Sequence, residues 1–252
     1  MSQVEINKIY CENNLETMAK IPDCFVDLTV TSPPYDNLRD YNGYSFSFES
    51  VAKELHRITK QGGVVVWVVG DATIKGSETG TSFRQALDFI KIGFNLHDTM
   101  IYSKTGMKNP SNDRYHQTFE YMFILSKDKP KTFNPIKDRK NKYVGVCGGE
   151  KSFRGEYGMR FNVWQYANGG NNTSKDDVFK HPAVFPELLA NDHIISWSNE
   201  GDLVYDPFMG SGTTAKMAML ANRNYIGSEI SQEYCDIAEK RIGKNLFSHR
   251  SL

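Results

Sequence analysis

The run GVVVWVVG, from Gly63 to Gly70, constrains the fold of this chain more than any other part of its sequence. It carries no charge and is mostly β-branched, which predicts a strand buried on both faces, as in the parallel sheet of an α/β protein. The run is far shorter than the roughly 20 residues of a membrane-spanning helix. Because such a strand needs helices on both sides of its sheet, the rest of the chain has to supply them.

Further β-rich runs lie along the chain, and helical patterns occur between them. Strands that alternate with helices predict an α/β protein with a doubly wound, mostly parallel sheet. We expect strands at 25–31, 63–70, 99–103, 121–126, 202–206 and 225–230. We expect helices at about 13–20, 49–59, 82–92, 186–197, 213–222 and 231–242.

The segment 127–178 interrupts this alternation. It is rich in Lys, Asn and Gly and lacks clear amphipathic periods. A loop of this length inside a compact domain is usually functional or disordered. We interpret it as an insertion and not as a linker, so that 1–126 and 179–252 form two halves of one domain around it.

Charge is unevenly distributed, although the chain as a whole has 30 Lys and Arg, 30 Asp and Glu and a formal net charge of zero. Between Lys104 and Arg160 there are 13 Lys and Arg against 6 Asp and Glu. Aromatic residues such as Tyr143 and Phe153 lie in the same stretch. This mixture suits a surface that binds a polyanion and stacks on bases. An ordinary solvated surface is the alternative.

The cysteines and the amino terminus indicate the compartment. Cys11, Cys24, Cys147 and Cys235 form no CxxC or Cys/His spacing, which argues against a disulfide framework and a zinc site. No apolar stretch follows the amino terminus, and mean hydropathy is −0.51, so we expect neither a secretory signal nor a membrane span. We therefore expect a cytoplasmic protein without a bound metal.

The segment DPFMGSGTT, from Asp206 to Thr214, follows an expected strand and opens an expected helix. Glycines in such a bend allow a tight turn and close approach of a ligand, and N–H groups at a helix start attract an anion. Glu229 ends the next strand, where a carboxylate can accept hydrogen bonds from ribose hydroxyls. A Walker loop would need a Lys before Thr213, whereas Ala215 still permits a dinucleotide.

The segment TSPPY, from Thr31 to Tyr35, ends another expected strand at the sheet edge where open α/β proteins bind ligands. Two prolines fix the backbone and leave the carbonyls of Ser32 and Pro33 as rigid acceptors. With the ring of Tyr35, they form a receptor suited to a planar amine. The alternative is a strand-terminating turn with Tyr35 packed in the core.

These two segments resemble the motifs of a known family, the amino-methyltransferases of DNA. SPPY resembles the catalytic motif of that family, and DPFMGSGTT resembles its S-adenosylmethionine motif. The catalytic motif comes first, and a long insertion precedes the cofactor motif, which is the circularly permuted order of the β group. Further similar blocks are YCEN at 10–13, GGVVVWVVGD at 62–71, FE at 119–120, KHPA at 180–183 and RNYIGSE at 223–229.

The resemblance implies the fold of S-adenosylmethionine-dependent methyltransferases, with 127–178 as the segment that recognises the target. It places the methionine part of the cofactor at the glycine bend, its carboxylate near Lys180 and His181, its ribose at Glu229 and its adenine at Asn13. Glu12-Asn13 stands where Gly-Asp is usual in the family. The implied cofactor residues are Asn13, Lys180, His181, Asp206, Phe208, Gly210, Ser211, Gly212, Thr213, Thr214, Glu229 and Ile230. The implied catalytic residues are Ser32, Pro33, Pro34 and Tyr35, and the expected DNA contacts are Arg39, Lys140, Lys142 and Arg154.

The expected reaction is methyl transfer to an exocyclic amine of a base flipped out of duplex DNA. Flipping costs a few kcal/mol, and stacking on Tyr35 returns about 1–3 kcal/mol. Cytosine C5 methylation needs a Pro-Cys nucleophile, which the chain lacks. Adenine N6 enzymes most often carry Asp in place of Ser32, so cytosine N4 is favoured and adenine N6 is the alternative.

Methylation of RNA or of protein glutamine usually goes with the opposite motif order. Two other classes stay open: a catalytically silent DNA-binding module, and a dinucleotide oxidoreductase, which would give SPPY no role. The expected partners are double-stranded DNA, a cognate restriction endonuclease and a second copy of the chain.

Overall fold

The computed structural model describes residues 4–34, 47–106, 112–147, 152–167 and 186–248. Their central feature is an eight-stranded sheet in the order β1-β14-β13-β2-β3-β7-β6-β12. Within this sheet β7 runs against its neighbours β3 and β6, and the other pairs are parallel. The strands are β1 (Lys8–Cys11), β2 (Val26–Thr31), β3 (Thr59–Val69), β6 (Asn95–Lys104), β7 (Phe119–Ser126), β12 (Val163–Tyr166), β13 (Leu203–Asp206) and β14 (Asn224–Glu229).

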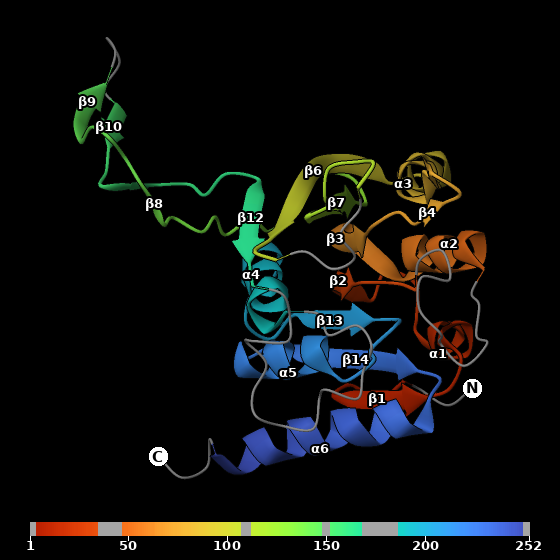
Figure 1. Ribbon diagram of the computed structural model, residues 1–252. Helices are drawn as coiled ribbons and strands as arrows, with labels where there is room; N and C mark the ends of the chain where they lie inside the picture. The colour runs from red at the N-terminus through yellow and green to blue at the C-terminus, as the bar shows by residue number, and fades with distance from the viewer. Residues whose placement is uncertain (1–3, 35–46, 107–111, 148–151, 168–185, 249–252) are drawn as a thin grey trace.

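Helices cover both faces of this sheet, as Figure 1 shows. The helices α1, α2 and α3 pack on one face, and α4, α5 and α6 pack on the other. Their bounds are α1 (Asn14–Lys20), α2 (Phe48–Ile58), α3 (Thr81–Ile92), α4 (Glu187–Trp197), α5 (Thr213–Leu220) and α6 (Gln232–Ser248). The expected doubly wound, mostly parallel α/β architecture is confirmed.

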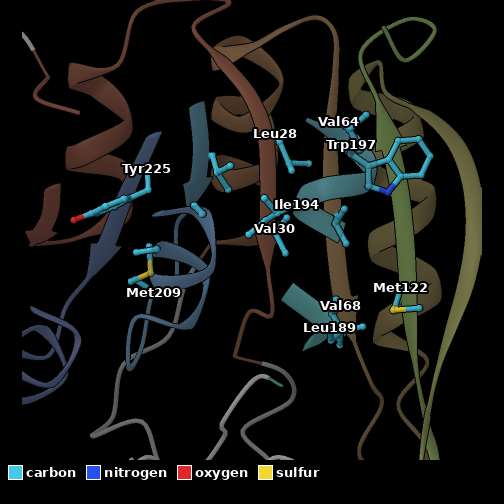
Figure 2. Close-up of a cluster of buried hydrophobic side chains, with 14 of the residues drawn as sticks. Leu28, Val30, Val64, Val68, Met122, Leu189, Ile194, Trp197, Met209 and Tyr225 are labelled. Carbon is cyan, nitrogen blue, oxygen red and sulfur yellow. The ribbon is translucent and has the colours of Figure 1, made fainter. Parts of the chain in front are cut away.

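The apolar run in β3 is buried on both faces, as its composition predicts. Val64, Val66 and Val68 pack into the layer under α4, α5 and α6, part of which is drawn in Figure 2. Val65 and Trp67 pack into the opposite layer, under α1, α2 and α3. Because side chains alternate along a strand, one uncharged segment fills both layers of the core.

The order in which the chain adds strands to the sheet changes direction between β2 and β13: β3 lies on one side of this pair and β14 on the other. The strands β2 and β13 are parallel neighbours, with Tyr205 opposite Thr29. The helix that follows β2 is α2, on one face, whereas the helix that follows β13 is α5, on the other. At such a switch point the two connections diverge and leave a crevice at the carboxyl ends of the strands, where α/β proteins bind ligands.

The segment 127–178 contains more regular structure than its sequence predicts. The antiparallel pairs are β8 (Arg139–Lys140) with β11 (Tyr157–Gly158), and β9 (Gly145–Cys147) with β10 (Ser152–Arg154). The β9–β10 ribbon projects away from the sheet (Figure 1). The last strand, β12, joins the main sheet beside β6, although the segment has no clear amphipathic periods in its sequence. The domain boundaries at 127 and 178 stay a prediction.

The strands and helices expected from the sequence are all present, with ends that differ by a few residues. Beside β12, sequence reasoning missed β1 and the short hairpin of β4 (Thr73–Ile74) and β5 (Ser77–Glu78). Within the described residues, no helix is long and apolar enough to span a membrane. The same residues contain no group of His, Cys, Asp and Glu arranged to hold a metal ion.

Candidate functional site

A buried carboxylate joins two segments, the SPP corner at 32–34 and the glycine bend at 206–214. Asp206, the last residue of β13, accepts a hydrogen bond from the Thr31 hydroxyl at 2.6 Å on Oδ1. Its other oxygen accepts one from the Thr214 hydroxyl at 2.7 Å. Thr31 directly precedes the corner, and Thr214 lies in the first turn of α5. The two motifs, far apart in the sequence, therefore meet at the carboxyl edge of β2 and β13.

The charge on Asp206 is held in an environment that disfavours it. Asp206 is buried, and burial raises the pKa of its carboxyl group to about 6. Hydrogen bonds from Thr31, Thr214 and the backbone N–H of Phe208 act in the opposite direction, because they stabilise the carboxylate. Among the described residues, these donors stabilise the buried carboxylate at neutral pH.

The bend itself requires glycine for a packing reason. Gly212 has φ +81°, in the left-handed region, and a Cβ built on it would lie 2.7 Å from the Cβ of Ala238 in α6. Any side chain there would therefore meet a helix. Gly210 is left-handed as well, with φ +53°.

The amide groups of the bend are partly used within the protein. Gly210 N–H donates to Glu229 Oε2 at 2.8 Å, and Gly212 N–H donates to the carbonyl of Met209 at 3.0 Å. The N–H groups of these two glycines therefore have partners within the protein, whereas the N–H groups expected to attract an anion are those at the start of α5, which begins at Thr213. The chain uses the two glycine N–H groups to hold the turn closed.

Glu229 lies at the end of β14, beside the bend. Besides Gly210, it accepts the backbone N–H of Ser231 at 2.9 Å on Oε1. Burial is the largest influence on its carboxyl group and raises its pKa. Each carboxylate oxygen has a second lone pair, so Glu229 can still accept hydrogen bonds from a ligand.

Three charged residues support the bend: Arg241 and Lys216, which are buried, and Glu187, which is half-buried. Arg241 of α6 donates to the carbonyl and hydroxyl of Ser211, at 2.6 and 2.9 Å. Glu187, at the start of α4, binds both Arg241 and Lys216, each at 2.7 Å. Arg241 is also 3.3 Å from the Thr213 hydroxyl. The hydroxyls of Ser211 and Thr213, expected to face a cofactor, thus have partners within the protein.

The SPP corner is partly accessible. Pro33 is buried, whereas Ser32 and Pro34 are half-buried. Four further expected site residues lie outside the described residues: Tyr35, Arg39, Lys180 and His181.

Three other expected cofactor residues surround the end of β14. Asn13 is exposed, and its side chain caps α1 by accepting the Leu15 N–H at 2.9 Å. Its position beside Glu229 follows from β1, in which Cys11 pairs with Glu229. Ile230 is exposed, and Phe208 contacts Trp67 edge to face at 6.3 Å between ring centroids.

Three of the four basic residues expected to bind DNA are exposed on the segment 127–178, the predicted insertion, hereafter called the inserted segment. Lys140 belongs to β8, Lys142 follows it, and Arg154 ends β10. Large apolar side chains lie among them: Tyr143 is 74% exposed and Phe153 is 73% exposed. Exposed aromatic and basic side chains on one projecting segment suit nucleic acid.

The inserted segment is anchored to the body through Arg160. Its guanidinium binds Asp192 of α4 at 2.6 Å and lies 5.1 Å from the ring of Trp164 in β12. It also binds Asp138, and it donates to the Tyr166 hydroxyl at 3.0 Å. The anchor therefore joins β12, the start of the segment and α4.

Sequence reasoning missed Thr31, Glu187 and Arg241 as parts of this site. Thr31 precedes the SPP corner and could have been found by asking which donor would satisfy Asp206. Glu187 and Arg241 are 54 residues apart, and no periodic pattern relates them.

Comparisons of the sequence with known proteins point to one family. Residues 26–240 match the family model N6_N4_Mtase, described as DNA methylase. The chain is 59% identical to the orphan methyltransferase M.BamHII of Bacillus amyloliquefaciens, covering 92% of this chain and 94% of the relative. It is 28% identical to the type II methyltransferase M.BglII of Bacillus subtilis, over 92% and 68% of the two chains.

Two solved structures share the fold. The cytosine-N4-specific PvuII DNA methyltransferase matches with a TM-score of 0.72 at 23% identity, over 95% of this chain and 87% of that chain. The complex of M1.HpyAVI with SAM matches with a TM-score of 0.63 at 23% identity, over 93% and 98%.

Proposed function

Because the chain belongs to the DNA methylase family of the N6_N4_Mtase model, we propose that it transfers a methyl group from S-adenosylmethionine to the N4 amine of cytosine in DNA. The observation that carries this proposal is the pair of hydrogen bonds through which Asp206 joins Thr31 to Thr214. A base held at the SPP corner and a cofactor held at the glycine bend would share one crevice.

The residues at the end of β14 fit an adenosyl cofactor. Glu229 has lone pairs left for ribose hydroxyls after binding its two backbone N–H groups. The exposed side chain of Ile230 adds an apolar surface beside it. Asn13 stays the predicted adenine contact, and Lys180 and His181 stay the predicted contacts of the cofactor carboxylate.

Bound S-adenosylmethionine supplies a methyl group that is already activated by its sulfonium. The chain has to bring a weakly nucleophilic amine, whose lone pair is delocalised into the base, in line with that methyl. Ser32 and the carbonyl of Pro33 would accept its N–H groups and turn the lone pair out of the ring plane. Tyr35 would stack on the base. Positioning and fixed dipoles would supply most of the rate enhancement.

The choice of cytosine N4 over adenine N6 depends on Ser32. The family model covers both amines, and adenine enzymes most often carry Asp at this place in the motif. Transfer to adenine N6 is therefore the second candidate, with the same residues in the same roles.

DNA would bind along the inserted segment. A two-stranded ribbon such as β9–β10 has the width to enter the major groove, and the exposed Lys140, Lys142 and Arg154 would contact phosphates. Extrusion of the target base would then deliver it to the corner at the sheet edge. Arg39 stays a predicted DNA contact.

The test is to incubate the purified protein with DNA and S-adenosylmethionine labelled in the methyl group, and to identify the modified nucleoside by mass spectrometry. We expect N4-methyldeoxycytidine. N6-methyldeoxyadenosine would select the second candidate. Cofactor binding without any transfer would favour the catalytically silent DNA-binding module and contradict the proposal.

A matched pair of variants tests the assigned residues. Tyr35→Ala should reduce kcat by at least about a hundredfold, because the base is no longer fixed within the tolerance of the reaction. Tyr35→Phe keeps the stacking ring and should stay close to wild type. Calorimetry should give the same affinity for S-adenosylhomocysteine in both. A parallel loss of cofactor affinity would contradict the role of Tyr35.

A restriction endonuclease partner stays a prediction. The 59% identical relative is named an orphan methyltransferase, whereas M.BglII is named a type II methyltransferase. The test is whether extracts of the native host cleave DNA that methylation by this protein protects.

The predicted homodimer has a candidate surface on α3. Phe83, Leu87 and Ile90 are 51%, 58% and 44% exposed and lie at helical spacing on one stripe. Sedimentation equilibrium should show a dimer that Leu87→Glu dissociates. A wild-type monomer would contradict this prediction.

A further inference from the structure

We propose that Thr31 is a positioning residue for methyl transfer, because its hydroxyl fixes the SPP corner to the glycine bend through the carboxylate of Asp206. This inference rests on the proposed function. Thr31 touches neither substrate nor cofactor in this account. It acts by fixing the position of the backbone that leads into Ser32.

The contact that carries the inference is short, buried and charge-assisted. Thr31 is 1% exposed, and its hydroxyl donates to Asp206 Oδ1 at 2.6 Å. The same oxygen also accepts the backbone N–H of Phe208 at 3.0 Å, which fixes the start of the bend. Hydrogen bonds to an ionised acceptor are about twice as strong as neutral ones. This hydrogen bond therefore holds the corner to the bend in addition to the backbone pairing of β2 with β13.

A second link runs parallel to the first. Thr214, in the first turn of α5, donates to Asp206 Oδ2 at 2.7 Å and lies 3.3 Å from the carbonyl of Val30. The ends of β2 and β13 and the start of α5 are therefore cross-connected at one carboxylate. Displacement of any of the three would change the separation between the base and the cofactor.

Thr29 provides an internal comparison on the same strand. It is fully buried like Thr31, but its hydroxyl has no hydrogen-bond partner among the described residues. Thr→Val at either position exchanges a hydroxyl for a methyl of similar size. Only at Thr31 does that exchange remove a donor from a buried carboxylate.

Loss of this donor should also change the protonation of Asp206. Burial, and to a smaller extent Glu229 on β14, raise the pKa of this carboxyl group, the hydrogen bond from Thr31 lowers it, and the net value is about 6. Glu229 is the titratable neighbour whose charge acts on Asp206 within the described residues. Without Thr31, the pKa of Asp206 rises, so Asp206 becomes protonated at a higher pH.

The experiment compares Thr31→Val, Thr31→Ser and Thr29→Val in the full-length protein. For Thr31→Val we expect kcat to fall 10- to 100-fold, with KM for S-adenosylmethionine and the affinity for S-adenosylhomocysteine changed less than threefold. Thr31→Ser keeps the donor and should recover kcat to within threefold of wild type. Thr29→Val should stay within threefold as well.

The pH profile separates positioning from a general structural role. In Thr31→Val the acid limb of kcat should move to higher pH, and in Thr29→Val it should not. Equal kcat values for Thr31→Val and Thr29→Val, or failure of Thr31→Ser to restore kcat, would overturn the inference. If Thr31→Val does not fold, Thr31→Ala takes its place, with the same expected results.

A readout without activity keeps this inference separate from the proposed function. The carboxyl resonance of Asp206 can be titrated by NMR in the wild type and in Thr31→Val. If the wild type transfers no methyl group to DNA, the proposed function fails, whereas an unchanged pKa of Asp206 in Thr31→Val defeats only the inference about Thr31.

Discussion

The sheet edge and the inserted segment differ in the burial and the hydrogen bonding of their charged and aromatic side chains. At the sheet edge, Asp206 and Arg241 are buried and bound to neighbours on other elements. On the inserted segment, Lys140 and Phe153 are exposed on strands of two or three residues, and Tyr143 is exposed between β8 and β9. The side chains at the sheet edge are held in place by buried hydrogen bonds within the protein. Those of the inserted segment are exposed and accessible to a ligand.

This contrast indicates how work is divided in the molecule. In-line transfer needs atoms held to within a fraction of an ångström, which buried hydrogen bonds provide. Reading a DNA surface needs charge and stacking area, which exposed side chains provide. Substitutions at the edge should therefore affect stability and catalysis, and substitutions on the segment should affect DNA affinity.

The largest expected effect on stability is that of Gly212→Val. A side chain there is strained at φ +81° and meets Ala238 at 2.7 Å, so unfolding free energy should fall by roughly 3–5 kcal/mol. Gly201 is the matched control, because it has φ +82° with no atom within 4 Å of an added Cβ. Gly201→Val should cost only the backbone strain, about 1–3 kcal/mol. Equal losses in urea denaturation would contradict the contact with α6.

The next largest effect on stability is expected from His193 of α4, which packs against Trp164 of the inserted segment. Its ring is buried, lies 4.6 Å from the ring of Trp164 between centroids, and has Nε2 3.2 Å from Met122 Sδ. Burial lowers the pKa of His193 to about 3. Between the unfolded value near 6.5 and about 3, the unfolded chain takes up a proton that the folded protein refuses.

Stability should therefore fall as pH drops below 6.5, and the contribution of His193 at pH 5 should be a loss of about 2 kcal/mol. In His193→Phe that contribution is absent. Urea denaturation at pH 7 and pH 5 should show a smaller decrease for the variant than for the wild type. Equal decreases would mean that His193 does not stay neutral in the folded protein.

A smaller effect is expected from the anchor at Arg160. Arg160→Met leaves Asp192, whose side chain is 13% exposed, without its cation, and should cost about 1–2 kcal/mol. Lys91→Met is the control, because the pair of Lys91 with Asp88 is exposed, at 75% and 44%, and such pairs contribute little. Equal effects of the two variants on the unfolding free energy would argue against an anchor.

The smallest effect on stability, and a clear one on binding, is expected from Lys140→Gln combined with Lys142→Gln. Unfolding free energy should stay within about 0.5 kcal/mol of wild type. The slope of log affinity for duplex DNA against log salt concentration should decrease by up to about 2. The pair Lys53→Gln and Lys91→Gln, exposed on α2 and α3, is the control. An unchanged slope would show that the inserted segment is merely solvated.

The sequence predicts the fold well where a local pattern coincides with the tertiary environment. The run in β3 is uncharged because both of its faces are covered, so composition alone identifies it. β12 has no such signal, since VWQY is short and half exposed, and its place depends on β6, some sixty residues earlier. Pairing across that separation is not encoded in local periodicity.

The candidate site divides in the same way. SPPY and DPFMGSGTT are recognisable because rigid or glycine-rich backbone leaves few alternatives. The supports beneath them are not recognisable, because Thr31, Glu187 and Arg241 are ordinary residues whose partners are distant in the chain. Sequence reasoning therefore found the residues proposed to face ligands and missed those that hold them in place.

Hydrogen exchange measured by mass spectrometry tests the division between the two regions most directly. Addition of S-adenosylhomocysteine should slow exchange in peptides that cover 206–214 and 227–234 and leave 139–160 unchanged. Addition of duplex DNA should slow exchange in 139–160. Protection of the inserted segment by S-adenosylhomocysteine, with no change at the glycine bend, would contradict the placement of the cofactor at the sheet edge.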